Sequence, residues 1–311
     1  MPTGKVGLCA LLTVGLMSLP VPVGAQSPIT LGYTGANDFL AAFVASDQGF
    51  FKKRGLDVTL TRIANGSTIP AAMIGGSITV GGITPTLFMQ ANDSGLELKI
   101  LAIASLQSSK NPTASVIVRK GVVVSAPGDF AGKKVGAPGL NSVMHAMFVR
   151  WLLAKGVDPA KVTFVETAMP QIGDLLKAGQ IDAGLPVEPF RSRIVEGGVG
   201  TVYANFFAEM RDNVIFSFYV VTAEWAAKHP QDVKGLREAL DEALAFIRTE
   251  TQEARKSQAA HLGLPPQIVE NLPLATYETK VDPAEVQFWL DLSRELGLVT
   301  RPLAVKDMIV E

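Results

Sequence analysis

The sequence predicts an α/β protein of two lobes, each a mostly parallel sheet flanked by helices. Short β-type runs alternate with helical patterns from residue 29 onward, which is typical of βαβ units. The chain of 311 residues is also too long for one small core. Finally, the run GSITVGGITP at 76–85 has a counterpart 103 residues later in GQIDAGLPVEPF at 179–190. Two lobes of similar construction would produce this repeat; chance similarity of βα units is the alternative.

The first lobe is expected to contain four strands separated by three helices. Its second strand, LDVTLTRI, alternates apolar and polar residues, and the helix before it ends at Gly55, a residue type that commonly closes helices. In chain order we expect strands at 29–34, 56–63, 77–82 and 98–105, and helices at 38–55, 67–76 and 84–95.

The second lobe repeats this alternation, and a helical region follows it. We expect strands at 115–120, 134–138, 162–167, 181–186 and 213–222, and helices at 141–156, 170–179, 188–198, 230–262 and 283–296. Two of these helices carry apolar stripes that we interpret as core rather than cofactor contacts. The stripes are Met144, Met147, Phe148, Trp151 and Leu152, and then Leu236, Leu240, Ala243, Leu244 and Ile247.

The first 25 residues are typical of a cleavable secretory signal peptide. Lys5 precedes an apolar run, and Val23-Gly24-Ala25 supplies the small residues that a signal peptidase requires. The run is shorter than the roughly 20 residues that span a bilayer, so an uncleaved anchor is the weaker alternative. The only cysteine, Cys9, lies within this segment. We therefore expect a cysteine-free mature protein in the periplasm that does not itself span the membrane.

Composition and motifs argue against several function classes. The 28 basic and 29 acidic residues are interspersed, which is unlike the basic surface of a nucleic-acid binder. The chain has no G-x-S-x-G, G-x-x-x-x-G-K or H-E-x-x-H motif. His145, His229 and His261 lie far apart and outside any metal-binding spacing. We expect no enzyme activity, catalytic residue, metal or cofactor, and only His145 lies near the expected cleft.

The candidate site lies where the strands end. In open parallel sheets, ligands bind outside the carboxyl ends of the strands, where helices present their N-termini. The loops at these positions are rich in Ser, Thr, Asn and Gly and carry no Arg or Lys. Helix capping alone would explain each such residue. Together, however, their N–H groups and hydroxyls could hold a small anion such as a carboxylate or sulfonate.

Most of the chain after residue 30 resembles a known family. The segments AAFVASDQGFFKKRGLDVTL, DFAGKKVGAPG, LLKAGQIDAGLPVEPF and LGLVTRP resemble substrate-binding proteins of nitrate/sulfonate/taurine-class ABC importers. The chain is also similar to thiamine-pyrimidine-synthase-like proteins. The resemblance implies a type II periplasmic binding protein fold with lobe 1 at 26–114 and 218–311 and lobe 2 at 115–217. The lobes would be joined near Pro112–Ser115 and Phe216–Tyr219.

The resemblance implies a monomeric periplasmic protein that binds a small organic anion between its lobes. The ligand would be a sulfonate or carboxylate, aromatic ones included, delivered to an ABC permease and its ATPase. Nitrate is less attractive because the loops lack a basic residue. The implied ligand-binding residues are Tyr33, Asn37, Asn65, Ser67, Thr84, Gln107, Gly139, Asn141, Ser142, Met169 and Glu188.

Two alternatives and one residue stay open. An enzyme of the same fold, such as a pyrimidine-precursor synthase or a dehydratase, is disfavoured by an exported, cysteine-free chain. A ligand sensor for a membrane receptor is a third possibility that the sequence leaves open. Glu188 either contacts the ligand, where it would suit an amine or a protonated group, or is an acid at a helix start favoured by the dipole.

Overall fold

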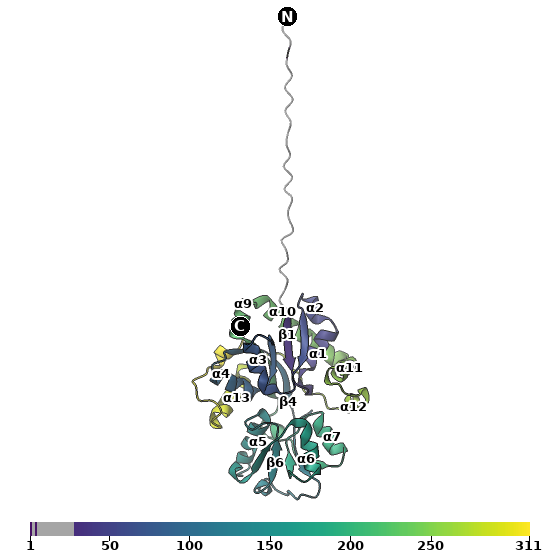
Figure 1. Cartoon of the computed structure of the whole chain (residues 1–311), viewed down its shortest axis with the longest axis vertical. Helices are drawn as coiled ribbons and strands as arrows, with labels where there is room; N and C mark the ends of the chain where they lie inside the picture. Colours follow the sequence, from purple (N-terminus) through teal and green to yellow (C-terminus); the bar gives the residue numbers. More distant parts are fainter. Residues whose placement is uncertain (2–3, 5–27) are drawn as a thin grey trace.

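The structure contains two five-stranded sheets, one above the other in Figure 1. It is a computed structural model that describes Met1, Gly4 and residues 28–311. The predicted signal peptide therefore falls almost wholly outside the described residues. The strand order is β2-β1-β3-β10-β4 in the first sheet and β7-β6-β8-β5-β9 in the second.

In the first sheet, four strands run in one direction and β10, which lies between β3 and β4, runs in the opposite direction. Strands β1, β2 and β3 run parallel, and β10 pairs antiparallel with both β3 and β4. Their bounds are β1 (Ile29–Tyr33), β2 (Val58–Arg62), β3 (Val80–Ile83), β4 (Leu98–Gln107) and β10 (Val214–Thr222).

The second sheet has the same composition. Strands β6, β7 and β8 run parallel, and β5 pairs antiparallel with β8 and β9. Their bounds are β5 (Val116–Arg119), β6 (Lys134–Ala137), β7 (Thr163–Glu166), β8 (Ala183–Gly184) and β9 (Gly200–Ala204). The two-sheet α/β architecture is confirmed, with mixed sheets and one strand, β9, that was not predicted.

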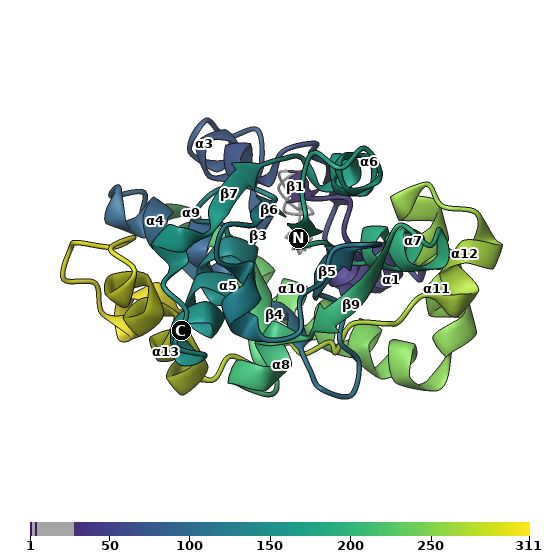
Figure 2. The ribbon, with the colours of Figure 1, turned by 90° about the horizontal axis from the view of Figure 1, so that it is seen from below.

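Helices cover both sheets. Those beside the first sheet are α1 (Leu40–Asp47), α2 (Phe50–Lys53), α3 (Ile69–Ile74), α4 (Pro85–Asp93), α9 (Ala223–Lys228), α10 (Pro230–Thr249), α11 (Thr251–Leu262), α12 (Pro266–Asn271) and α13 (Pro283–Glu295). Figure 2 shows α4 and α13 on one flank of the molecule and α11 and α12 on the other. The helix predicted at 38–55 is divided because Gly49 adopts a left-handed conformation with φ of +74°.

The second sheet is covered by α5 (Val143–Ala154), α6 (Ile172–Lys177), α7 (Phe190–Glu196) and α8 (Phe206–Met210). Both predicted apolar stripes, on α5 and on α10, are buried throughout. Their assignment to the core is confirmed. Within residues 28–311, no helix has the length and apolar character needed to span a bilayer.

The sequence repeat reflects matching construction of the two sheets. A Cβ added to Gly81 would lie 2.5 Å from Met73 and 2.8 Å from Ile69. At the counterpart Gly184, it would lie 2.5 Å from Ile172 and 3.7 Å from Leu176, the residues 103 positions after Ile69 and Met73. Both glycines let a helix pack closely on the central strands, so chance similarity does not explain the repeat.

The chain passes between the sheets twice. The first passage joins β4 to β5 through residues 108–115, as predicted. The second joins β9 to β10 before Val214, ahead of the predicted Phe216–Tyr219. That prediction is wrong because β10 pairs with β4 from Val214 onward. The lobe boundaries themselves stay a prediction.

Candidate functional site

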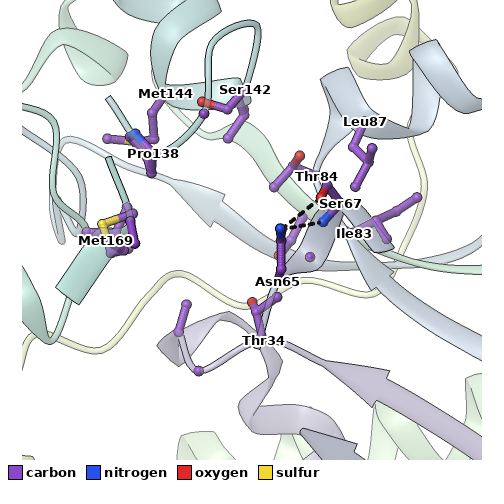
Figure 3. Close-up of a pocket in the computed structure, with 18 of the residues that line it drawn as sticks. Thr34, Asn65, Ser67, Ile83, Thr84, Leu87, Pro138, Ser142, Met144 and Met169 are labelled. Carbon is purple, nitrogen blue, oxygen red and sulfur yellow. Dashed lines mark hydrogen bonds between the residues drawn. The ribbon is translucent and has the colours of Figure 1, made fainter. Parts of the chain in front are cut away.

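A cavity of about 710 Å³ lies between the two sheets. Segments that follow β1, β2 and β3 line it from one side, and segments that follow β6 and β7 line it from the other. Figure 3 shows this arrangement, with Asn65, Ser67 and Thr84 across from Pro138, Ser142 and Met169. The volume suits a small ligand held by both sides.

Seven of the eleven predicted site residues line this cavity. They come from strand-end loops of both sheets, so residues more than 100 positions apart share one space. The seven are Asn65, Ser67, Thr84, Gly139, Asn141, Ser142 and Met169.

The other four predicted residues are not part of the cavity lining; they are buried and engaged elsewhere. The Tyr33 hydroxyl donates to the carbonyl of His261 at 3.2 Å. The Asn37 amide donates to the carbonyl of Pro273 at 3.1 Å. The Gln107 amide donates to the Thr113 hydroxyl at 2.8 Å. Glu188 is the fourth.

The lining includes three charged residues that are not among the predicted site residues. Arg62 is the last residue of β2, and its guanidinium donates to the Leu262 carbonyl at 3.2 Å. Asp38 and Glu166 also line the cavity. The expectation of a site without a basic side chain is therefore wrong, and the argument against nitrate loses its basis. Arg62 lies within the predicted strand 56–63, so the pattern of strand-end loops does not indicate it.

Helix starts beside both sheets contribute residues to the cavity lining. The Ser142 hydroxyl caps α5 by accepting from the His145 N–H at 3.3 Å. The Asn65 side chain accepts from the Ser67 N–H at 3.1 Å and from the Ser67 hydroxyl at 2.8 Å (Figure 3). Thr84 precedes α4 but its hydroxyl caps nothing in the described structure. The first turn of a helix leaves N–H groups without intrahelical partners, so the α4 start can receive an anion.

His145 supports the cavity wall without lining it. Its Nδ1 accepts the Asn141 N–H at 3.1 Å, and its ring packs edge-on against Phe164 at 4.4 Å between centroids. Asn141 has φ of +65°, which asparagine tolerates better than most residues. Burial lowers the pKa of His145 below its usual 6.5. The neutral ring, with an unprotonated Nδ1, therefore holds this loop.

Acidification is expected to loosen the loop through His145. Because the folded-state pKa is lowered, the stabilising contribution is present above about 6.5 and is lost as pH falls through the lowered value. Replacing His145 with Ala should cost about 0.5–1.5 kcal/mol of unfolding free energy at neutral pH, the usual range for one hydrogen bond. His145→Asn, whose Oδ1 can accept the same N–H, should retain most of it. Denaturant unfolding at pH 7.5 and 5 checks this, and equal pH dependence in wild type and both variants would contradict it.

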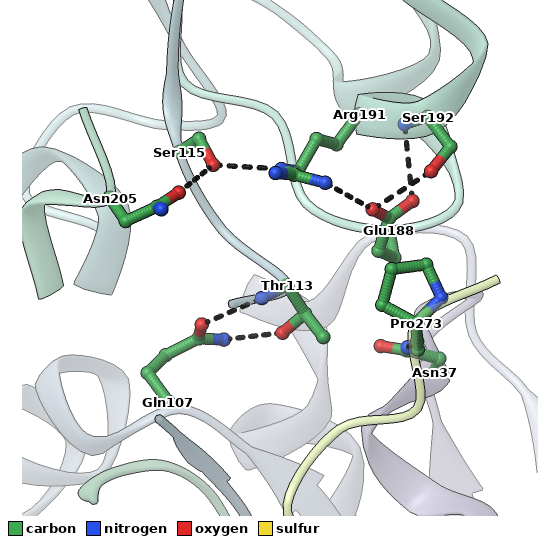
Figure 4. Close-up of polar contacts among 9 residues, drawn as sticks. All are labelled: Asn37, Gln107, Thr113, Ser115, Glu188, Arg191, Ser192, Asn205 and Pro273. Atoms are coloured by element: carbon green, nitrogen blue, oxygen red, sulfur yellow. Dashed lines mark hydrogen bonds and ion pairs between the residues drawn. The ribbon is translucent and has the colours of Figure 1, made fainter. Parts of the chain in front are cut away.

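Glu188 is not part of the cavity lining, and its carboxylate makes hydrogen bonds within the protein (Figure 4). Its side chain is fully buried and accepts from Arg191 at 3.0 Å, from the Ser192 N–H at 3.1 Å and from the Ser192 hydroxyl at 3.0 Å. Helix α7 begins at Phe190, two residues later than predicted. Burial raises the pKa of Glu188, while the Ser192 and Arg191 contacts oppose that rise. Its carboxylate accepts an N–H of the first helical turn, close to the helix-start role.

Arg191 connects this carboxylate to the first passage between the sheets. Its Nε donates to the Ser115 hydroxyl at 2.8 Å, and Ser115 donates to Asn205 at 2.7 Å (Figure 4). The Glu188 N–H also donates to the Thr113 carbonyl at 2.9 Å. Since Val187 and Phe190 line the cavity on either side of Glu188, this network fixes part of the cavity wall to the passage.

The sequence is similar to those of a periplasmic binding protein and of a protein named for thiamine biosynthesis. The chain is 23% identical over 208 residues to the taurine-binding periplasmic protein of Escherichia coli (strain K12), covering 67% of this chain and 63% of that protein. The match thus spans less than two thirds of that relative. It is 24% identical over 313 residues to a Haemophilus influenzae protein named for thiamine biosynthesis, covering 96% of each.

Among solved structures, the alkanesulfonate-binding protein SsuA from Xanthomonas axonopodis pv. citri bound to MOPS superposes with a TM-score of 0.76. Identity is 18%, with 91% of this chain and 97% of that chain covered, so this likeness concerns the fold. The resemblance inferred from the sequence is confirmed. Residues 24–263 match the model of the NMT1-like family, and since this is well over half of the sequence, the chain belongs to that family.

Proposed function

We propose that the chain is a periplasmic solute-binding protein that captures a small organic anion between two lobes. The cavity carries the proposal, because helix N-termini from both sheets and the cation of Arg62 converge on about 710 Å³. Contacts from both sides favour a closed form, since a ligand stabilises the conformation to which it binds more tightly. Lobe 1 would comprise 26–114 and 214–311, and lobe 2 would comprise 115–213, because β10 belongs to the first sheet from Val214 onward.

The proposed partners and location follow from the relatives' names. An exported monomer that closes on its ligand would present the closed form to an ABC permease driven by its ATPase. Sulfonates and carboxylates are the favoured ligands, and nitrate is restored as a candidate by Arg62. The site residues that support this proposal are the seven that line the cavity together with Arg62.

A thermal-shift screen tests the function. The probes are taurine, methanesulfonate, benzoate, nitrate and bicarbonate, with sodium chloride at equal ionic strength as the control. A ligand at 100 times its Kd stabilises the folded state by about 2.7 kcal/mol, which raises the Tm of a protein of this size by roughly 5 °C. We expect such a rise for at least one organic anion. If none of the five raises the Tm above the chloride control, anion capture is contradicted.

An enzyme of the thiamine-biosynthesis type is the second candidate, favoured by the match over 96% of the Haemophilus influenzae protein. Within the described residues, however, the cavity lining contains no Cys, His or Lys. Incubation of the purified protein with an aminopyrimidine, followed by proton NMR, separates the candidates. Conversion of the probe would favour the enzyme, whereas unchanged probe and bound anion would favour the carrier.

A further inference from the structure

Asp38 is a buried carboxyl at the cavity. It lies in the 3-10 helix η1 (Asn37–Phe39), whose three residues are all buried, and only 5% of Asp38 is exposed. It nevertheless lines the cavity, as do Phe39 and Ser217 beside it. A charged group so placed is costly unless a partner or a proton neutralises it.

Hydroxyl groups are the polar neighbours of this carboxyl. The Ser105 hydroxyl on β4 donates to Oδ1 at 3.1 Å, and the Ser217 hydroxyl on β10 lies 2.7 Å from that of Ser105. With the Ser105 proton committed to Asp38, Ser217 donates to Ser105. A chain of two hydrogen bonds thus connects Ser217, in the cavity lining, with the Asp38 carboxyl through Ser105.

No cation neutralises Asp38: across residues 28–311, no Lys, Arg or His nitrogen lies within ion-pair distance of it. The titratable groups that face it are Tyr219 on β10 and Tyr277, whose hydroxyl donates to the Asn37 carbonyl at 2.8 Å. Burial and the Asp38 charge both raise the pKa of these tyrosines, so they stay neutral. Arg62 is the cation that lines the same cavity.

Burial raises the pKa of Asp38 to about 7, and the Ser105 hydrogen bond only partly opposes the rise. The folded state therefore favours the protonated carboxyl. The protonated Asp38 carboxyl contributes its full stabilisation below about pH 3.8, the ordinary pKa, and this contribution is lost as pH rises through about 7. An anion in the cavity would repel the ionised carboxylate and favour the protonated form further.

We propose that Asp38 is a specificity-determining residue whose carboxyl is protonated when the anion is bound. Each captured monoanion therefore adds one proton to this carboxyl. The inference rests on the proposed function. A proton from solvent joins the carboxylate, and the pair of anion and proton adds no net charge to the cavity. Monoanions such as sulfonates or carboxylates would then be preferred over dianions such as sulfate, which would leave one uncompensated charge.

Calorimetry in buffers of different ionisation enthalpy tests this inference, because the buffer dependence of the heat gives the protons taken up. The probes are methanesulfonate, benzoate and taurine at pH 8, with sulfate for comparison. We expect wild type to take up close to one proton per bound monoanion, and its affinity to fall about tenfold per pH unit above 7. Asp38→Asn should bind with little proton uptake and a flat pH profile. Asp57→Asn, an exposed residue before β2, is the matched control and should behave as wild type.

The outcomes separate this inference from the function. Binding by wild type without proton uptake, or equal uptake by Asp38→Asn, overturns the role of Asp38 and leaves anion capture standing. Binding of taurine with loss of affinity in Asp38→Asn and no proton uptake would show Asp38 holding an ammonium group, which also overturns it. If no probe binds wild type, the proposed function fails and this inference with it. If Asp38→Asn does not fold, the proton uptake of wild type decides alone.

Discussion

Replacing Arg62 with Gln is expected to weaken binding of a small organic anion about 10- to 100-fold. A hydrogen bond to a charged group contributes about 1.5–3 kcal/mol, and each 1.4 kcal/mol is a tenfold change in affinity. Arg62 is exposed at the end of β2, and within the described residues its side chain makes one hydrogen bond, to the Leu262 carbonyl, so replacing it should change the Tm little. Calorimetric titration with methanesulfonate and benzoate, together with the Tm of the free protein, measures both quantities.

Arg248→Gln is the matched control for this variant. Arg248 is also exposed, but it lies near the end of α10 and outside the cavity lining. It should bind as wild type does. An affinity loss of the same size in both variants would indicate a general effect of net charge and would remove Arg62 from the site.

Replacing Glu188 with Ala is expected to lower the free energy of unfolding by about 3–5 kcal/mol, the usual result of removing one member of a buried ion pair. The change leaves the Arg191 guanidinium, the Ser192 hydroxyl and the Ser192 N–H without their acceptor. Because the side chain of Glu188 is fully buried, water cannot easily replace the lost contacts. Denaturant unfolding followed by circular dichroism measures the loss.

Glu196→Ala is the control, since Glu196 is exposed at the other end of α7. It should change stability by less than about 0.5 kcal/mol, as is usual for surface substitutions. Arg191→Met in the Glu188→Ala background should recover part of the loss by removing the unpaired cation. A loss below 1 kcal/mol in Glu188→Ala would contradict the assigned network.

The fold could be predicted largely because local and long-range signals agree. The apolar residues of α5 and α10 recur with the helical period, which is typical of a helix with one buried face. In the structure both of these faces are buried. The repeat around Gly81 and Gly184 survives because any larger residue would collide with the covering helix. Strand β9 was missed because Gly200–Ala204 is a short run after the glycines of the preceding turn, and its pairing with β5 joins residues some 80 positions apart.

The site could be predicted only as far as strand ends reveal it. Residues after parallel strands gather at one edge, so Asn65, Thr84, Asn141 and Ser142 were found without knowledge of side-chain direction. For the other residues, the direction of the side chain determines whether it reaches the cavity. Glu188 and Gln107 also follow predicted strands, but their side chains make hydrogen bonds beside the first passage instead of lining the cavity (Figure 4). Arg62, by contrast, is the last residue of a strand and lines the cavity. Nothing in the local sequence specifies these orientations.

A cavity-filling variant tests the central claim most directly. Thr84 lines the cavity, and its hydroxyl caps nothing in the described structure, so Thr84→Trp should occupy the space without removing a cap. Calorimetric titration of wild type and variant with taurine, methanesulfonate and benzoate measures the binding. We predict one-to-one binding of at least one anion by wild type and none by Thr84→Trp, with similar Tm values for the two free proteins. Undiminished binding by the variant would place the ligand elsewhere and contradict the proposed site.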